Sequence, residues 1–210
     1  MVYVLTARCD AVSEDELHEW LKCMPDHLVS KARNFTFPQD ARRYLLGKLL
    51  LVKGAAMLGF YSLKTEDIRL NDFNRPYITN GPDFNISHSG NYVLCALSSD
   101  QKVGIDVEEI REVDFALFTN CFTENEWSHI NDSPSPTTLF YKFWTRKEAV
   151  IKADGRGLNI PLQSFEVVHD LVTLATDSWY IRRIDIAEGY MAHFVTNAAA
   201  PGDVLVRQIV

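Results

Sequence analysis

Acidic residues alternate with apolar ones in the segment Val103–Glu108. Successive side chains of a β-strand point to opposite faces, so a strand here would place Asp106 and Glu108 on one face and Ile105 and Val107 on the other. Carboxylate oxygens are the ligands that a hard cation such as Mg²⁺ prefers, and Mg²⁺ usually adds water and phosphate oxygens to them. Two carboxylates directed at one point therefore indicate a candidate Mg²⁺ site.

A third acid lies between two lysines in Phe143–Lys152, a segment whose spacing fits an α-helix. Residues three or four positions apart share one face of a helix. The resulting stripe consists of Trp144, Glu148 and Lys152, with Lys147 beside it. Three acids and two lysines in two segments suggest diphosphate chemistry. Taken separately, both patterns are common: alternating strands are often half exposed, and acid–base pairs on solvated helices contribute only about 0.2 to 0.5 kcal/mol each.

The two segments together resemble the signature of the 4′-phosphopantetheinyl transferases, specifically the surfactin-synthetase type within the holo-carrier-protein synthase superfamily. Further segments resemble other motifs of this family in the same order, and the matches run from about residue 31 to residue 165. These segments are Asp40–Arg43 before Leu45–Gly47, Asn74–Tyr77, Phe84–Gly90, Gly155–Leu158 and Pro161–Leu162. Several independent motifs in one order are hard to obtain by chance.

The resemblance implies transfer of the 4′-phosphopantetheine arm of coenzyme A to a serine hydroxyl of an apo acyl or peptidyl carrier protein, with release of adenosine 3′,5′-bisphosphate. It also implies that Asp106, Glu108 and Glu148 hold Mg²⁺ (or Mn²⁺) at the diphosphate. Lys152 would contact the phosphate at the bond that breaks. Lys147 would assist the leaving phosphate or orient Glu148, and Glu148 is a candidate base for the incoming serine.

A second set of residues is expected to bind coenzyme A, again by the resemblance. This set is Lys31, Arg43, Arg75, Pro76, Ser87, His88, Ser89 and Lys152. Within it, Lys31, Arg43 and His88 are expected at the 3′-phosphate, and Arg75 with Pro76 against the adenine.

The chain has a net charge of −7, so attraction of the polyanionic coenzyme must be local. Arg42 and Lys48 are interpreted as solvated residues of a helix face. Two positions depart from the family pattern: Leu28 stands where relatives commonly have a basic residue, and Arg75 stands where lysine is usual. Both departures concern coenzyme affinity more than the chemistry.

Local patterns predict an α+β protein. The expected strands are Val2–Ala7, Ile68–Phe73, Phe84–Ile86, Tyr92–Ser98, Val103–Glu108, Phe165–Val168, Trp179–Ile184, Tyr190–Thr196 and Val204–Ile209. The expected helices begin at the capping boxes Ser13 with Glu16 and Thr123 with Glu126, near Pro38, and at Thr137, where the catalytic helix runs to Ala153. The family resemblance implies two similar α/β subdomains, residues 1–102 and 103–210, packed as a pseudo-dimer with the active site in the cleft between them.

Composition is that of an ordinary globular protein, with 47% hydrophobic and 23% charged residues. No apolar run reaches the roughly 18 residues of a membrane span, and the four cysteines have no metal-binding spacing. We expect a cytoplasmic monomer that contacts neither nucleic acid nor membrane.

The carrier itself is not identified by the sequence. Apolar residues of Phe115–Trp127 are expected to meet its hydrophobic helix, with Phe118 as a test position, while Arg111 steers its acidic surface. Three rival functions remain open: a non-catalytic coenzyme A sensor, a module that docks carriers without modifying them, and a Mg²⁺-dependent diphosphate hydrolase.

Overall fold

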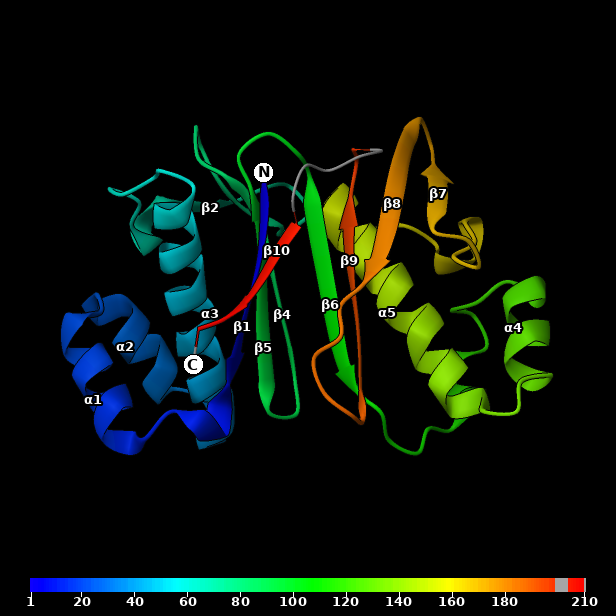
Figure 1. The fold of residues 1–210 in the computed structure, drawn as a ribbon, viewed down its shortest axis with the longest axis horizontal. Helices are drawn as coiled ribbons and strands as arrows, with labels where there is room; N and C mark the ends of the chain where they lie inside the picture. The colour runs from blue at the N-terminus through cyan, green and yellow to red at the C-terminus, as the bar shows by residue number, and fades with distance from the viewer. Residues whose placement is uncertain (199–203, 210) are drawn as a thin grey trace.

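The structure is a computed structural model that describes residues 1–198 and 204–209 (Figure 1). The helices are α1 (Glu14–Cys23), α2 (Asp26–Arg33), α3 (Pro38–Met57), α4 (Glu124–Asn131) and α5 (Pro136–Asp154). The strands of the first half are β1 (Val2–Arg8), β2 (Ile68–Leu70), β3 (Pro76–Ile78), β4 (Asp83–Ser89) and β5 (Tyr92–Ser98). Those that follow are β6 (Val103–Glu109), β7 (Leu171–Leu174), β8 (Asp177–Arg183), β9 (Tyr190–Thr196) and β10 (Val204–Gln208).

Two four-stranded sheets form the centre of the molecule, in the orders β10-β1-β5-β4 and β6-β9-β8-β7, and β2 pairs separately with β3. Figure 1 shows the two sheets side by side, with α1, α2 and α3 outside the first and α4 and α5 outside the second. The long helix α3 packs on β1 and β5, as α5 packs on β6 and β9. The predicted α+β class is confirmed, and each sheet carries one long helix.

The C-terminal strand departs from the expected division at residues 102 and 103. Strand β10 pairs in parallel with β1, so Val204 lies opposite Val2 and the end of the chain completes the sheet of the first half. Strand β6, in contrast, belongs to the second sheet and pairs antiparallel with β9.

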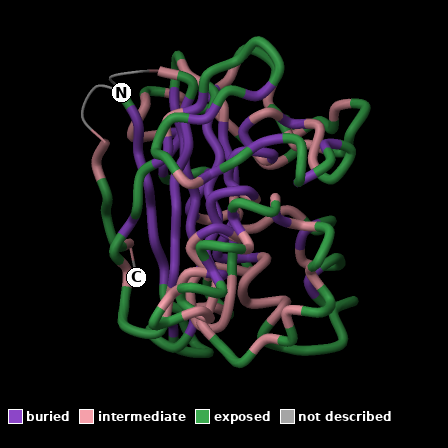
Figure 2. Tube along the Cα trace, turned by 90° about the vertical axis from the view of Figure 1, so that its right-hand side faces the viewer, coloured by how far each residue is buried: buried purple, intermediate pink, exposed green. Residues whose placement is uncertain are grey.

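Three buried apolar clusters stabilise this arrangement. One lies between α5 and its sheet and includes Phe143 and Val150, and another lies beneath α3 and includes Leu50. A third cluster joins the two sheets through residues such as Ile105. Figure 2 shows the buried residues concentrated along the long central strands. Because burying one such side chain is worth about 1.5 to 3 kcal/mol, the shared cluster couples the two halves energetically.

Most predicted elements are present with shifted ends. Both predicted capping boxes form, with Ser13 and Glu16 at α1 and Thr123 and Glu126 at α4. The expected strand Phe165–Val168 is wrong. These residues form no ladder because buried side chains satisfy their backbone: Lys147 donates to the Phe165 carbonyl and Glu126 accepts from the Val167 N–H.

No helix in the described part of the chain is long and apolar enough to cross a membrane.

Candidate functional site

The first acid of the site, Asp106 on β6, is almost fully buried at the junction of the two sheets, with 2% of its surface exposed. Its Oδ1 atom accepts a hydrogen bond from Lys152 Nζ at 2.5 Å and one from Ser87 Oγ at 2.8 Å. Its Oδ2 atom has no hydrogen-bond partner among the described residues. A buried carboxylate oxygen without a partner is costly, so this atom indicates a place for a ligand.

The second acid, Glu108, lies two residues further along β6 on the same face, as the alternation predicted. Its Oε2 atom accepts a hydrogen bond from Ser89 Oγ at 2.7 Å. Burial and then the neighbouring charge of Asp106 raise the pKa of Glu108. The two carboxylates therefore repel each other.

The third acid, Glu148, reaches the same place from α5. Burial is the main cause that raises its pKa; Lys152 opposes the shift, and the charges of Asp106 and Glu108 add to it. For Lys152, burial disfavours the charged form, but the three carboxylates outweigh it and raise the pKa of the ammonium group. Strand β6 and helix α5 thus bring together the three predicted acids and one of the two predicted lysines.

The donor set of this cluster fits a hard divalent cation, because every donor atom is a carboxylate oxygen and Asp106 Oδ2 is buried without a partner. The cluster is not already arranged as a coordination sphere: within residues 1–198 and 204–209, no three acidic, histidine or cysteine side chains stand at ligand spacing. The Lys152 ammonium neutralises Asp106 in this arrangement.

Lys147 is the predicted site residue that the structure places elsewhere. Its side chain is completely buried and forms an ion pair with the equally buried Glu126 at 2.8 Å. The ammonium also donates to the carbonyls of Leu162 and Phe165 at 2.6 and 2.7 Å. All its donors are therefore used in the core of the second half. The expected contribution to catalysis is replaced by a structural one.

A hollow of about 390 Å³ lies at the junction of the two halves, and Lys152, which bonds to Asp106, is in its lining. It is lined by Arg43, Tyr44, Gly47, Lys48, Phe73, Asn74, Arg75, Pro76, Phe84, Asn85, Ile86, His88, Ile151, Lys152, Gly155 and Gly157. The residues come from α3, β3, β4 and α5 and the turns beside them, so both halves contribute. Five of the predicted coenzyme-binding residues are in this lining: Arg43, Arg75, Pro76, His88 and Lys152.

One wall of the hollow is cationic. Arg43 is held in place by hydrogen bonds to the Gly90 carbonyl and to Asp40. Desolvation by the surrounding protein, and then the positive charges of Arg43 and Lys152, lower the pKa of His88. This wall is suited to bind an anion, whose negative charge would neutralise these cationic groups.

Lys48 belongs to the same wall, contrary to its interpretation as a solvated residue. The ammonium groups of Lys31 and Lys48 both lie over the Tyr44 ring, 5.2 and 5.4 Å from its centroid. Burial, followed by the charge of Lys31, lowers the pKa of Lys48. Leu28 is buried, and Lys48 places a second ammonium group beside that of Lys31. Lys48 follows Tyr44 by one helical turn, and this spacing is the sequence feature that could have predicted their contact.

Arg75 is placed at the hollow but is not free to recognise adenine with its guanidinium. That group makes two parallel hydrogen bonds to Asp83, at 2.9 and 2.7 Å, and also donates to the carbonyls of Lys152 and Val103. It therefore ties the first half to β6 and α5. The expected contact with adenine is corrected to an internal bridge, whereas Pro76 remains in the lining.

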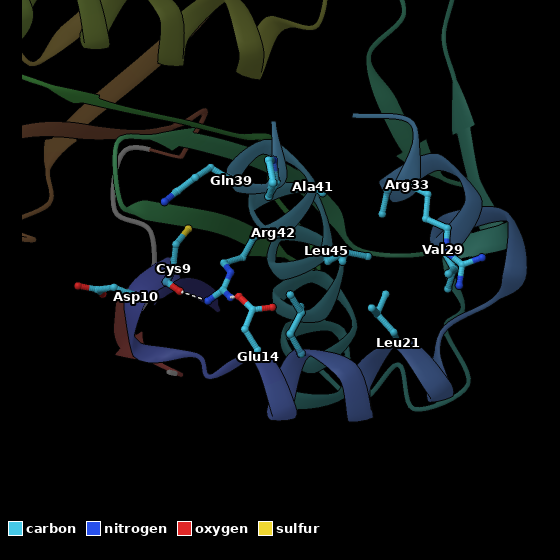
Figure 3. A pocket seen from close by; sticks show the side chains of 13 residues that line it. Cys9, Asp10, Glu14, Leu21, Val29, Arg33, Gln39, Ala41, Arg42 and Leu45 are labelled. Atoms are coloured by element: carbon cyan, nitrogen blue, oxygen red, sulfur yellow. Dashed lines mark hydrogen bonds and ion pairs between the residues drawn. The ribbon is translucent and has the colours of Figure 1, made fainter. Parts of the chain in front are cut away.

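A separate hollow of about 480 Å³ lies between α1, α2 and α3 (Figure 3). Arg42 donates to the backbone carbonyls of Cys9 and Val12 and pairs with Glu14 there. Arg42 is therefore not the solvated residue expected from the sequence, because these bonds hold its largely buried side chain against the backbone. Since the lining includes neither Lys152 nor any other residue predicted to bind coenzyme A, we do not place the candidate site in this hollow.

The aromatic side chains of the segment before α4 pack against the core. Phe118 packs against Phe140 and Trp144, with ring centroids 5.0 and 5.3 Å apart, and Phe122 is fully buried. Phe118 is therefore a poor choice as an exposed docking residue. Leu117 is 78% exposed and is the apolar side chain that this segment presents to solvent.

Comparison with known proteins agrees with the motifs. Residues 102–197 match the profile of the 4′-phosphopantetheinyl transferase superfamily, and residues 11–100 match that of the 4′-phosphopantetheinyl transferase N-terminal region. The chain is 35% identical over 162 residues to 4′-phosphopantetheinyl transferase Sfp of Bacillus subtilis (strain 168), covering 74% of this chain and 71% of that protein. It is 40% identical over 146 residues to 4′-phosphopantetheinyl transferase gsp of Aneurinibacillus migulanus, covering 65% and 60%.

A solved structure, the holo-[acyl-carrier-protein] synthase of Thermotoga maritima, overlaps 45% of this chain and 61% of its own with a TM-score of 0.36 and 18% identity. That overlap is too slight to carry an argument, whereas the sequence matches cover both halves. The chain is an enzyme that belongs to the 4′-phosphopantetheinyl transferase superfamily.

Proposed function

We propose that this protein transfers the 4′-phosphopantetheine group of coenzyme A to a serine hydroxyl of an apo acyl or peptidyl carrier protein. The observation that carries this proposal is the junction of three carboxylates and Lys152 with a hollow whose opposite wall is cationic. A diphosphate at the acids and a second phosphate on the cationic wall match the charge pattern of coenzyme A.

In this proposal, Lys31, Arg43, Lys48 and His88 bind the 3′-phosphate, and Lys152 contacts the diphosphate. Asp106, Glu108 and Glu148 hold Mg²⁺ (or Mn²⁺), which would neutralise the charge that develops on the diphosphate. The serine oxygen attacks the phosphorus on the pantetheine side, and the bridging P–O bond breaks. Adenosine 3′,5′-bisphosphate leaves with the bridging oxygen. Glu148, whose pKa is raised mainly by burial, accepts the serine proton.

Analysis of the small-molecule products separates this proposal from hydrolysis. Incubation with coenzyme A and Mg²⁺ should release adenosine 3′,5′-bisphosphate only when apo carrier is present, which chromatography can measure. Release of free phosphopantetheine without carrier would instead identify a diphosphate hydrolase, and release of neither product would favour a binding module.

Removing the arginine of the cationic wall should distinguish two forms of the substrate. Arg43→Ala is expected to lower kcat/KM by about 10- to 100-fold with coenzyme A, because a hydrogen bond to a charged group is worth roughly 1.5 to 3 kcal/mol. Dephospho-coenzyme A lacks the 3′-phosphate, so the same variant should lose much less with it. Steady-state kinetics with both substrates make the comparison, and equal losses would show that Arg43 acts only through Asp40 and Gly90.

His88 should take up a proton when coenzyme A binds. In the free protein its pKa lies below the ordinary value of about 6.5, so the ring is largely neutral at that pH. A bound phosphate favours the charged ring and raises this pKa, so affinity should increase as pH falls into the interval between the two values. Calorimetry near pH 6.5 in buffers of different ionisation enthalpy measures the uptake. His88→Gln is the matched control, and equal proton uptake by both proteins would exclude this role.

The exposed apolar residue before α4 offers a test of carrier docking. Leu117→Glu is expected to raise the KM for the carrier about tenfold and to leave the Kd for coenzyme A unchanged, because Leu117 lies outside the coenzyme hollow. Leu171→Glu, an exposed leucine on β7, is the matched control. Unchanged carrier kinetics for Leu117→Glu would remove this surface from the proposal.

A further inference from the structure

Two edge strands, one from each sheet, meet at the junction of the halves without forming a backbone ladder. Strand β4 ends the first sheet and β6 ends the second. The N–H groups of β6 instead donate to side-chain oxygens of β4. The four bonds are Val103 N to Asp83 Oδ2 at 2.8 Å, Ile105 N to Asn85 Oδ1 at 3.0 Å, Val107 N to Ser87 Oγ at 3.3 Å and Glu109 N to Ser89 Oγ at 3.1 Å.

This side-chain ladder has a regular register. Each donor on β6 follows its acceptor on β4 by 20 residues, and alternate residues of both strands take part. The period of two is that of a β-strand, so one face of β4 supplies all four oxygens. Unpaired N–H groups at a sheet edge are normally a liability, and here short polar side chains satisfy them.

The Ser87 and Ser89 hydroxyls each make a second hydrogen bond, to an acid of the cluster, whereas Asp83 and Asn85 do not. Ser87 Oγ donates to Asp106 Oδ1 at 2.8 Å, and Ser89 Oγ donates to Glu108 Oε2 at 2.7 Å. A hydroxyl has one proton and two lone pairs. Because each hydroxyl accepts from a backbone N–H of β6, its proton is directed to the carboxylate that β6 carries.

The other two acceptors of the ladder, Asp83 and Asn85, have different surroundings. Asp83 binds the Arg75 guanidinium, and Asn85 lines the coenzyme hollow. Among the described residues, neither forms a hydrogen bond with an acid of the cluster. The chemistry of the ladder thus changes along β4, from an ion pair and an amide to two hydroxyls where the acids begin.

The Ser87 hydroxyl is fully engaged. Ser87 Oγ accepts from Lys152 Nζ at 3.3 Å in addition to its other bonds. Neither serine is among the described residues that line the coenzyme hollow. These facts do not suit their expected use as direct ligands of coenzyme A.

We propose that Ser87 and Ser89 are positioning residues that orient Asp106 and Glu108 across the junction of the two halves. What the acids then do rests on the proposed function. Each carboxylate belongs to the second half, but the group that orients it belongs to the first. The geometry of the acid cluster therefore depends on the relative position of the two halves. The side-chain ladder and the hydrogen bonds from Arg75 to the Lys152 and Val103 carbonyls fix that position.

Mn²⁺ binding in the absence of coenzyme A tests this proposal without turnover. Ser87→Ala and Ser89→Ala should weaken Mn²⁺ binding, measured by electron paramagnetic resonance, by about tenfold or more, which is typical for loss of a group that orients a metal ligand. Ser89→Thr keeps the hydroxyl and should restore binding to within about twofold of the wild-type value. Asn85→Ala removes the hydrogen bond from the Ile105 N–H to a side chain that contacts no acid. It should therefore lower the Tm as much as the serine variants do, but leave the Mn²⁺ affinity nearly unchanged.

A double-mutant cycle completes the test. In a Glu108→Gln background, Ser89→Ala should have little further effect on Mn²⁺ binding, because the carboxylate that the hydroxyl orients is already gone. Unchanged Mn²⁺ affinity in both alanine variants, an equal loss in Asn85→Ala, or a wild-type protein that binds no Mn²⁺ would each overturn the proposal. Wild-type transfer is assayed alongside: its failure would contradict the proposed function, while the Mn²⁺ affinities would still decide the positioning role.

Discussion

Replacing either central acid should abolish most of the transfer activity. Asp106→Asn and Glu148→Gln are each expected to lower kcat by at least about 100-fold, because charge stabilisation by the metal is worth several kcal/mol. Glu148 is half-buried beside the charges of Asp106 and Glu108, so its loss removes a metal ligand and the proposed base together. Single-turnover kinetics with saturating coenzyme A and carrier measure the effect on the chemical step.

The amide variants preserve shape, so folding can be checked independently. Their Tm values should remain close to that of the wild-type protein, and coenzyme A should still bind through the cationic wall. Wild-type turnover by Asp106→Asn or Glu148→Gln, in a buffer with controlled Mg²⁺, would remove that acid from the site.

Lys147 should determine stability and not catalysis. Lys147→Met leaves the Glu126 carboxylate buried without its cation, and breaking a fully buried ion pair on one side costs about 3 to 5 kcal/mol. For a chain of this size we expect the Tm to fall by about 10 °C, measured by thermal unfolding. The protein that remains folded should keep a kcat near that of the wild type, since the ammonium lies away from the acids.

The double variant Lys147→Met with Glu126→Gln is the matched control, because it removes both charges. It should recover part of the lost stability, as replacement of both members of a buried pair is often nearly neutral. If Lys147→Met instead lowered kcat strongly with an unchanged Tm, the catalytic role expected from the sequence would be restored.

The acids were predictable because their geometry is local. Alternation fixes which residues of β6 share a face, and a helical stripe fixes that Glu148 and Lys152 lie together on α5. The same reasoning could not locate the partner of Lys147, because Glu126 lies on another helix and the choice depends on how α4 packs. A residue beside a stripe can face either the site or the core.

Non-local contacts explain the other differences. The motif around Arg75 predicted its place at the hollow, but only the fold brings Asp83 and the Val103 carbonyl within reach of the guanidinium. Likewise, the sequence of β10 is strand-like, yet nothing local reveals that it pairs with β1 at the opposite end of the chain. Ser87 and Ser89 were predicted to bind coenzyme A, whereas their hydroxyls bond to the acids. These bonds require two strands 20 residues apart to be aligned, which no local pattern reveals.

The intact mass of an apo carrier protein tests the central claim most directly. After incubation with this protein, coenzyme A and Mg²⁺, the carrier should gain the mass of one phosphopantetheine group, and a carrier whose acceptor serine is replaced by alanine should gain nothing. A carrier whose mass stays unchanged, while wild-type Sfp converts the same preparation fully, would contradict the proposed transfer.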